Sequence, residues 1–161
     1  MTRIRIGYGY DVHPFSENRE LILGGIRIPY PMGLLGHSDA DALLHALTDA
    51  ILGALALGDI GTHFPDTDPQ YKGADSGILL QDAYTMVRAR GYRLGNADMT
   101  VVCEKPKLKP YINPIRKRIA SLLDVGEEDL SVKATTHEKM GFVGREEGIA
   151  VHAVVLLMEE G

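Results

Sequence analysis

The sequence contains a single cysteine, Cys103, and no tryptophan among its 161 residues. One cysteine excludes an intrachain disulfide, and it also excludes a structural zinc site built from several thiolates. No apolar run approaches the ~20 residues of a transmembrane helix, and the N-terminus lacks the apolar stretch of a secretory signal. We therefore expect a reducing compartment, either the cytoplasm or, once a transit peptide has been removed, a plastid.

The sequence also has fewer basic than acidic residues, 17 against 22, and its formal net charge is -5. Non-specific binding to nucleic acids relies on basic patches, so this balance argues against a nucleic-acid partner. Basic residues cluster at 105–109 and at 116–118, and the second cluster is interpreted as the solvated face of a helix. The length and the ordinary hydrophobic share predict one globular domain over residues 1–161.

Hydrophobic periodicity and the placement of glycine and proline predict eight elements. Strands are expected at 3–13, 21–30, 97–104, 130–136 and 149–158, and helices at 39–57, 76–90 and 111–123. The second strand is expected to form a hairpin with the first, with a bulge or turn at Gly24 and Gly25. Ser38 is expected to cap the first helix, and residues 61–73 to form a loop without regular structure, suited to a substrate lid. The order predicts an α/β sandwich of the α+β type, a mixed sheet with helices mainly on one face.

A set of histidine and aspartate residues gathers around the first strand and the first helix. Asp11 and His13 are two residues apart on the strand, so their side chains point to one face. His37, Asp41, His45 and Asp49 recur at every fourth position and share one polar side of the helix. One carboxylate and two imidazoles, from Asp11, His13 and His45, form a three-ligand set suited to Zn²⁺, with a fourth position open for chemistry.

Each of these residues also has a purely structural explanation. A buried histidine is usually a core residue with its hydrogen bonds satisfied, and Asp11 alone could cap a turn. The combination of strand spacing and a polar helix side favours the metal site. Asp49 is then expected to hold the outer nitrogen of a ligating histidine.

A second group of polar residues lies at 133–145, between two expected strands. Its hydroxyls, glycines and cations suit a polyphosphate, and its carboxylate suits a divalent cation that bridges phosphate oxygens. A long charged hairpin is the structural alternative. Together with the zinc set, the segment favours a phosphate-bearing substrate and phosphoryl transfer.

Four ordered motifs resemble the 2-C-methyl-D-erythritol 2,4-cyclodiphosphate synthases of the non-mevalonate isoprenoid pathway. They are residues 9–13, 35–41 with His45, 58–61 followed by 64–68, and 133–145, and the resemblance covers nearly the whole chain. It implies conversion of 4-diphosphocytidyl-2-C-methyl-D-erythritol 2-phosphate to the cyclodiphosphate, with release of CMP, by a phosphorus–oxygen lyase. The 2-phosphate of the substrate attacks its own β-phosphorus, so positioning replaces a protein nucleophile.

The same resemblance implies a role for each matching residue. Zn²⁺ would bind Asp11, His13 and His45, and a second divalent ion, Mg²⁺ or Mn²⁺, would bind Glu138 and the substrate phosphates. His37 and Thr136 would stabilise the transition state. The substrate would contact Asp11, His13, His37, Ser38, Asp59, Ile60, Gly61, Phe64, Pro65, Asp66, Thr67, Asp68, Phe142 and Arg145. The cytidine would bind Cys103, Glu104, Lys105, Pro106, Lys107, Leu108, Lys109, Thr135 and Thr136.

Members of that family are homotrimers whose active sites lie between subunits. The metal side would come from one subunit and the cytidine loop from its neighbour. Phe142 and Arg145 resemble the lining of an axial cavity that can hold an isoprenoid diphosphate.

Three positions depart from the usual family pattern: Cys103 replaces a smaller residue, Lys109 an apolar one, and His137 a threonine or asparagine. We expect little effect from Cys103 and Lys109, because the loop reads a pyrimidine largely through backbone groups. His137 could add a weak metal-adjacent group or do nothing, and we favour no role for it. Two other functions remain open, a different metal-dependent phosphohydrolase and a non-catalytic trimer that binds isoprenoid diphosphates.

Overall fold

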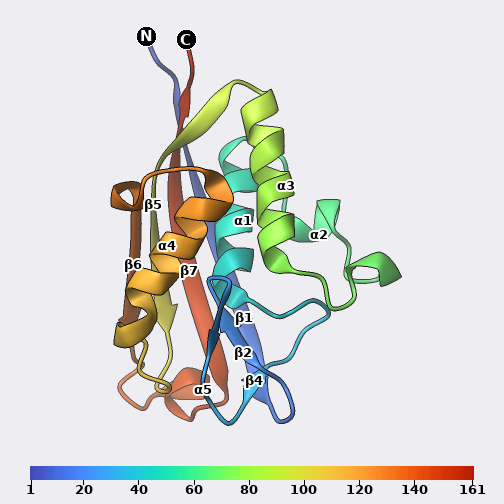
Figure 1. Ribbon diagram of the computed structural model, residues 1–161, viewed down its shortest axis with the longest axis vertical. Coiled ribbons are helices and arrows are strands. Elements are labelled where there is room, and N and C mark those ends of the chain that lie inside the picture. Colours follow the sequence, from blue (N-terminus) through green and yellow to red (C-terminus); the bar gives the residue numbers. More distant parts are fainter.

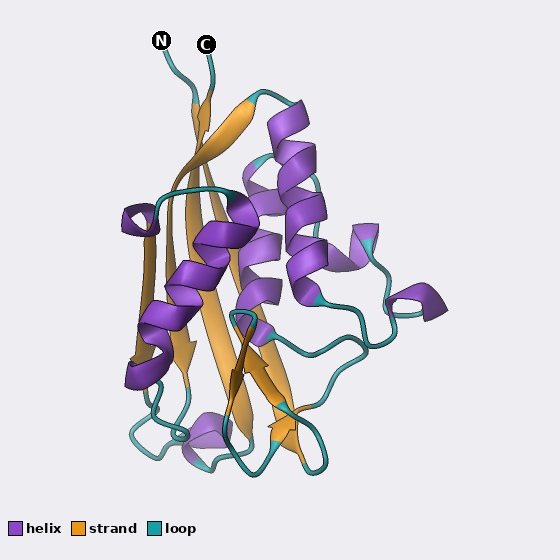
Figure 2. Cartoon of the chain, viewed as in Figure 1, coloured by secondary structure: helices purple, strands orange, loops and turns teal.

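The computed structural model describes residues 1–161 and has two layers (Figure 1). A five-stranded mixed sheet forms one layer, and long helices cover one of its faces (Figure 2). In the order β4-β1-β7-β5-β6 the strands are β4 (Gly33–Leu34), β1 (Ile4–Ser16), β7 (Gly148–Glu159), β5 (Tyr92–Val102) and β6 (Leu130–Thr135). The covering helices are α1 (Ala42–Ala54), α3 (Ser76–Ala89) and α4 (Ile112–Leu123). The predicted sandwich with helices mainly on one face is confirmed.

Strands β1 and β7 form the long central pair of the sheet. They run antiparallel from the pair Ile4↔Met158 to the pair Pro14↔Gly148, which brings both chain termini to one end (Figure 1). Strand β7 is antiparallel to β5, and β5 is parallel to β6. None of the helices combines the length and apolar character needed to cross a membrane.

Strand β1 turns its large apolar side chains away from the helices. Its exposed large hydrophobic residues are Ile4, Ile6, Tyr8, Tyr10 and Val12. On its other face, a Cβ atom added at Gly7 would lie 1.8 Å from the Ala50 carbonyl oxygen, and one added at Gly9 would lie 1.9 Å from that of Ala46. Helix α1 therefore packs directly on the backbone of β1, and only glycine allows this approach.

The predicted strand at 21–30 is wrong in extent and in partner. Residues Leu21–Leu23 (β2) and Ile26–Ile28 (β3) pair with each other as a separate hairpin. Gly24 and Gly25 form the turn between them, with φ values of 61° and 74° that favour glycine. The turn reverses the chain, so the segment does not continue as one strand beside β1.

Helix α1 begins later than predicted, and its cap is Asp41 rather than Ser38. The Asp41 carboxylate accepts hydrogen bonds from the backbone N–H groups of Leu44 (3.0 Å), Gly24 (2.9 Å) and Gly25 (2.7 Å). Burial raises the pKa of Asp41 to about 6, although these N–H groups act in the opposite direction. One buried carboxylate thus joins the start of α1 to the β2–β3 turn.

Two further boundaries differ from the sequence prediction. Strand β5 starts at Tyr92 rather than at residue 97, because a bulge between Leu94 and Asn96 interrupts the alternation on which the prediction relied. The segment 61–73 is not wholly irregular. It includes the end of helix α2 (Ile60–His63), capped by Asp59, and a 3₁₀ turn, η1 (Pro69–Tyr71), capped by Asp68.

The remaining short elements are helix α5 (Gly141–Gly144) and two 3₁₀ turns, η2 (Lys109–Tyr111) and η3 (Glu127–Asp129). Helix α5 lies in the connection from β6 to β7, at the end of the molecule opposite the chain termini (Figure 1).

Candidate metal centre and substrate pocket

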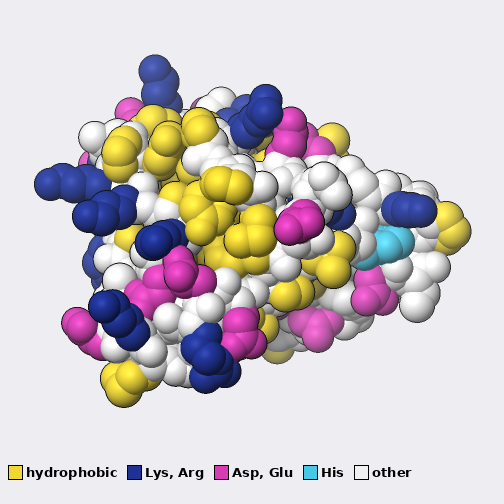
Figure 3. Space-filling model, turned by 90° about the horizontal axis from the view of Figure 1, so that it is seen from below, with side chains coloured by type: hydrophobic (Ala, Val, Ile, Leu, Met, Phe, Trp, Pro, Cys, Tyr) yellow, Lys and Arg dark blue, Asp and Glu magenta, His cyan; other side chains and the backbone are white.

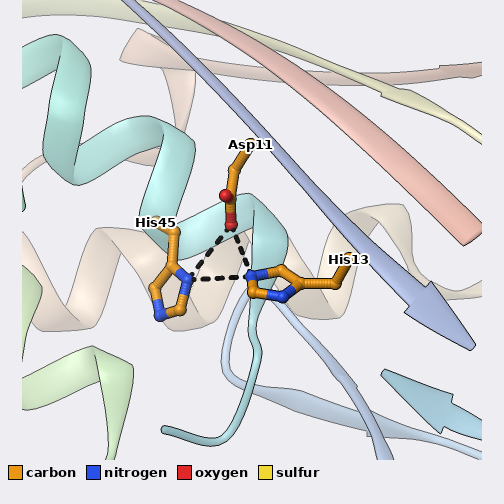
Figure 4. A group of neighbouring side chains, drawn as sticks. All are labelled: Asp11, His13 and His45. Carbon is orange, nitrogen blue, oxygen red and sulfur yellow. Dashed lines mark hydrogen bonds and ion pairs between the residues drawn. The ribbon is translucent and has the colours of Figure 1, made fainter. Parts of the chain in front are cut away.

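Asp11, His13 and His45 meet between strand β1 and helix α1 (Figure 4). Asp11 Oδ2 lies 2.8 Å from His13 Nε2 and 3.1 Å from His45 Nδ1. The two ring nitrogens are 3.3 Å apart. The close packing of α1 on Gly7 and Gly9 brings the three side chains together, because it places His45 directly over the strand that carries the other two.

The chemistry of this cluster suits a divalent cation. A carboxylate oxygen and two imidazole nitrogens are hard and borderline donors that Zn²⁺ accepts. Ligand atoms about 2.0–2.2 Å from a tetrahedral zinc ion are separated by roughly 3.3 Å, which is close to the spacing of these three atoms. All three ligand atoms lie within 4.8 Å of one another, and the side chains are partly accessible, so a fourth ligand has room.

The members of the cluster also shift one another's protonation. Burial alone raises the pKa of Asp11, but hydrogen bonds and charge from His13 and His45 outweigh it, and the pKa is lowered overall. Burial lowers the pKa of His45, but the hydrogen bond and charge of Asp11 outweigh that effect and raise it. Asp11 is therefore held as a carboxylate, the form that binds a metal ion.

The outer nitrogens of both histidines have partners that hold the rings in place. His13 Nδ1 lies 2.9 Å from the carbonyl oxygen of Leu35, so it carries the proton and leaves Nε2 free as a ligand. His45 Nε2 lies 2.7 Å from Ser76 Oγ and 3.1 Å from Ser38 Oγ.

Asp49 does not have the role predicted for it. Its carboxylate accepts a hydrogen bond of 2.7 Å from the N–H of Ile60 and so joins α1 to the start of α2. The spacing of four residues correctly places Asp49 on the side of α1 that carries His45. That spacing does not reveal that the hydroxyls of Ser76 and Ser38 already contact the outer nitrogen of His45.

A pocket of about 400 Å³ opens beside the three ligands. The predicted zinc ligand His45 lines it, as do many predicted substrate contacts, namely Asp11, His13, His37, Ser38, Ile60, Gly61, Phe64, Pro65 and Asp66. Asp59 and Asp68 act instead as helix caps, although His37 Nε2 lies 3.2 Å from the Asp68 carbonyl oxygen. Thr67 is not among the lining residues.

Three lining residues were not predicted: Gly36, Tyr71 and Leu79. Tyr71 packs edge-on against Phe64, with ring centroids 5.7 Å apart. The signal available in the sequence was a second aromatic residue in an otherwise polar loop. Leu79 gave no such signal, since its spacing on α3 is that of an ordinary core residue.

The second group of predicted residues lies elsewhere on the chain. Strands β5 and β6 are parallel and pair Val102 with Thr135, so residues 103–109 and 136–139 emerge side by side at one edge. Glu104 Oε1 accepts a hydrogen bond of 2.6 Å from the N–H of Lys139, and Lys105 lies 3.7 Å from Glu146. None of these residues lines the pocket beside the metal ligands.

Thr136 and Glu138 line hollows of their own at this edge. Thr136 Oγ1 accepts a hydrogen bond of 3.1 Å from the N–H of Glu138, whose φ of 52° belongs to a tight turn. His137 Nδ1 lies 3.2 Å from the Met140 carbonyl oxygen, a local contact consistent with the minor role expected for it. In Figure 3, most of the Lys and Arg side chains in view lie in the left half of the picture.

The remaining predicted residues have identifiable surroundings. Phe142 packs against a small cluster of Val102, Val143 and Ala150. Arg145 forms an ion pair with Glu147. Cys103 is free and buried, and burial raises the pKa of its thiol to about 11.

Comparisons with known proteins give matches over almost the full chain. A sequence model of the YgbB family matches residues 4–158. Proteins named 2-C-methyl-D-erythritol 2,4-cyclodiphosphate synthase from Bacillus cytotoxicus and Bacillus mycoides are 61% and 60% identical to the chain over 156 residues. Each of these alignments covers 97% of this chain and 99% of the relative.

Solved structures agree with these matches. The bifunctional IspDF from Campylobacter jejuni superposes with a TM-score of 0.96 at 50% identity, covering 99% of this chain and 43% of that one. A 2C-methyl-D-erythritol-2,4-cyclodiphosphate synthase in its CDP-bound form gives 0.88 at 41% identity, over 95% of this chain and 99% of that one. The family model and these relatives show that the chain belongs to the YgbB family.

Proposed function

We propose that the chain converts 4-diphosphocytidyl-2-C-methyl-D-erythritol 2-phosphate to 2-C-methyl-D-erythritol 2,4-cyclodiphosphate with release of CMP, in isoprenoid precursor biosynthesis. The observation that carries the proposal is the convergence of Asp11, His13 and His45 beside an open pocket, in a chain 61% identical to a synthase of that name. CDP bound to a relative 41% identical in sequence supports a cytidine nucleotide as the ligand.

The reaction is a phosphorus–oxygen lyase reaction within one substrate molecule. An oxygen of the 2-phosphate attacks the β-phosphorus, and a P–O bond forms that closes the ring. The bond from the β-phosphorus to the oxygen bridging the two phosphates breaks, and CMP leaves with the electron pair. Catalysis then consists of positioning the 2-phosphate against the diphosphate and neutralising the charge of both groups.

Asp11, His13 and His45 would hold Zn²⁺, and Glu138 would hold Mg²⁺ or Mn²⁺ together with the substrate phosphates. These ions would supply the positive charge that phosphoryl transfer requires. The Thr136 hydroxyl already accepts the N–H of Glu138, so its own proton is free for a phosphate oxygen. His37, which lines the metal pocket, would contact the phosphates from that half of the site.

The remaining contacts are proposed from the resemblance of each segment to the family motifs. The methylerythritol part would lie against Ser38, Asp59, Ile60, Gly61 and the segment Phe64, Pro65, Asp66, Thr67 and Asp68. The cytidine would bind the loop of Cys103, Glu104, Lys105, Pro106, Lys107, Leu108 and Lys109, with Thr135 and Thr136. Phe142 and Arg145 would line the cavity that can hold an isoprenoid diphosphate.

We also propose that the chain works as a homotrimer with each active site between two subunits. The metal pocket contains no residue of the cytidine loop or of 133–145, so one chain presents two separate halves of the site. In addition, the uncovered face of the sheet exposes 73% of Ile6 and 58% of Tyr8, beside Val154 of β7. Apolar groups in such numbers favour a buried interface between copies of the chain.

Phosphorus-31 NMR of the protein with the cytidine substrate and Mg²⁺ tests the reaction. We expect CMP together with two coupled resonances of a cyclic diphosphate. Inorganic phosphate would support the phosphohydrolase instead. An unchanged spectrum from zinc-loaded protein would support a trimer that only binds isoprenoid diphosphates.

Mixing two inactive variants tests whether the site is shared. His45→Ala removes a metal ligand, and Thr136→Ala removes a group from the other half. If each site combines two chains, randomly mixed trimers recover about one quarter of the wild-type activity, because one site in four receives both intact halves. If each site belongs to one chain, mixing restores nothing.

A further inference from the structure

The outer nitrogen of His45 ends a chain of hydrogen bonds that begins at Asp39. Ser76 is the first residue of α3 and is fully buried, and its hydroxyl lies 2.7 Å from His45 Nε2. The same hydroxyl contacts the carboxylate of Asp39, whose other oxygen accepts a hydrogen bond of 2.9 Å from the Ser76 N–H. The metal site proposed above uses only the inner nitrogen of His45. Ser76 contacts the outer nitrogen, and Asp39 has had no role in the site so far.

We propose that Asp39 and Ser76 are positioning residues that fix the tautomer and orientation of His45, so that its Nδ1 lone pair points at the metal ion. The inference rests on the proposed zinc site and extends it. No sequence motif pointed to Ser76, which lies 31 residues from His45 along the chain.

The direction of the hydrogen bonds follows from the chemistry of the groups. A carboxylate only accepts, so the Ser76 hydroxyl must donate its proton to Asp39. The hydroxyl oxygen then offers only lone pairs to His45, and Nε2 must carry a proton to bond with it. A neutral imidazole carries one proton, so Nδ1 is left bare, as metal binding requires.

The backbone around these residues keeps the arrangement rigid. The N–H of Asp39 donates to the Ala74 carbonyl oxygen at 3.1 Å, and the N–H of Gly73 donates to that of His37 at 2.8 Å. These bonds join the segment before α1 to the segment before α3. Asp39 also accepts the N–H of Asp41 at 3.0 Å, so its carboxylate is held from both sides.

Ser38 gives the imidazole a second, weaker contact. Its hydroxyl lies 3.1 Å from His45 Nε2 and accepts the N–H of Ala40 at 3.4 Å. This contact is longer than that of Ser76, and the Ser38 hydroxyl bonds to no carboxylate. Ser76 is therefore the residue that sets the position of the proton on His45.

Zinc affinity, measured by competition with a chelator of known affinity, tests the proposal without any assay of activity. Ser76→Ala is expected to weaken zinc binding about 10–100-fold, as is typical when the partner of a ligating histidine is removed. The matched control is Thr48→Val, which removes another fully buried hydroxyl from helix α1, one that bonds only the Leu44 carbonyl oxygen. The control is expected to keep the affinity within about twofold of wild type.

Asp39→Ala provides a second test that removes no hydroxyl. Without the carboxylate, the Ser76 hydroxyl is free to donate to His45 Nε2, which favours the tautomer with the proton on Nδ1. Zinc binding should weaken here too, and nitrogen-15 NMR of the imidazole should show less protonated Nε2 than in wild type. In wild-type protein loaded with zinc, Nε2 should carry a slowly exchanging proton.

The outcomes separate this inference from the metal site itself. Full zinc affinity in both Ser76→Ala and Asp39→Ala would overturn it, as would an equal loss in Thr48→Val or an unprotonated Nε2 in the wild type. If the wild-type protein bound no zinc at all, the proposed metal site would fail first and this inference with it.

Discussion

Gly9 and Ala46 are in direct backbone contact, since a Cβ atom on Gly9 would lie 1.9 Å from the Ala46 carbonyl oxygen. Ala46 follows His45, and Gly9 precedes Asp11 by two residues; His45 and Asp11 both belong to the candidate metal site. The contact therefore sets the separation between the two elements that carry the metal site. The packing of α1 on β1 and the spacing of the candidate metal ligands therefore both depend on the absence of a side chain at Gly9.

Gly9→Ala is expected to push α1 away from β1 and to lower the free energy of unfolding by about 3 kcal/mol or more. The three ligand atoms would separate, so zinc affinity should fall as well. Urea denaturation at fixed protein concentration and zinc titration would measure both effects. Gly53→Ala is the matched control, because its new Cβ would meet only the Tyr8 carbonyl oxygen at 3.9 Å. It should stabilise α1 by about 0.5–1 kcal/mol.

Asp41→Asn is expected to destabilise the protein by about 1–3 kcal/mol, although the side chain keeps its shape. An amide group offers one acceptor oxygen, whereas the carboxylate accepts hydrogen bonds from N–H groups at both of its oxygens. The N–H of Gly25 would then face an NH₂ group. Urea denaturation measures the change. Asp75→Ala, which removes an exposed cap with one bond to Gly77, should cost only about 1 kcal/mol, and an equal loss in both variants would contradict the argument.

The order of the main elements could be predicted because helices and strands here follow their usual periods. The errors arose where a contact between distant segments sets the local structure. The carboxylate of Asp41 caps α1 and also accepts the N–H groups of the β2–β3 turn. The residues around Ser38 give no sign of this distant contact. The bulge in β5 similarly breaks the alternation that marks a strand.

The convergence of Asp11, His13 and His45 could be predicted for a different reason. Asp11 and His13 are fixed by strand spacing, and His45 lies on the helix that follows. The partners of the outer nitrogens were not predictable, because Ser76 belongs to α3 and Leu35 contributes only its carbonyl oxygen. Residues that act through backbone atoms or across long loops leave little trace in a single sequence.

His45→Ala is expected to abolish tightly bound zinc and activity while the chain stays folded. The two ligands that remain, Asp11 and His13, come from one strand and leave the helix side of the cation open. Metal analysis and circular dichroism measure the two quantities. In the wild type, a chelator should remove activity and added zinc should restore it. Zinc retained at full occupancy by the variant would refute the ligand assignment.

Cys103 is expected to react about 100-fold more slowly with thiol reagents at pH 8 than the unfolded chain does, because burial raises its pKa from 9.0 to about 11. The folded thiol keeps its proton while the unfolded thiol loses it. Stability should therefore fall as the pH rises from about 9 to about 11. Labelling rates of native and urea-unfolded protein between pH 7 and 11 measure this shift. A native midpoint at or below 9 would contradict it.

Lys107→Ala is expected to raise KM for the cytidine substrate about tenfold with a smaller change in kcat, as follows from losing a charged contact made before the reaction. The side chain is exposed and forms no ion pair, so stability should not change. Steady-state kinetics separate the two constants. Lys117→Ala removes an exposed charge from α4 and should leave both unchanged. A fall in kcat alone would argue against a role in substrate binding.

The outward apolar side chains of β1 would have a consequence for the chain before the proposed trimer forms. A newly made copy displays Ile4, Ile6, Tyr8 and Tyr10 to its surroundings until other copies cover them. Assembly requires encounters between chains, so it would slow steeply on dilution, whereas this exposed surface can also attract unrelated chains. The yield of the proposed trimer would then depend on how quickly copies of the chain meet after synthesis.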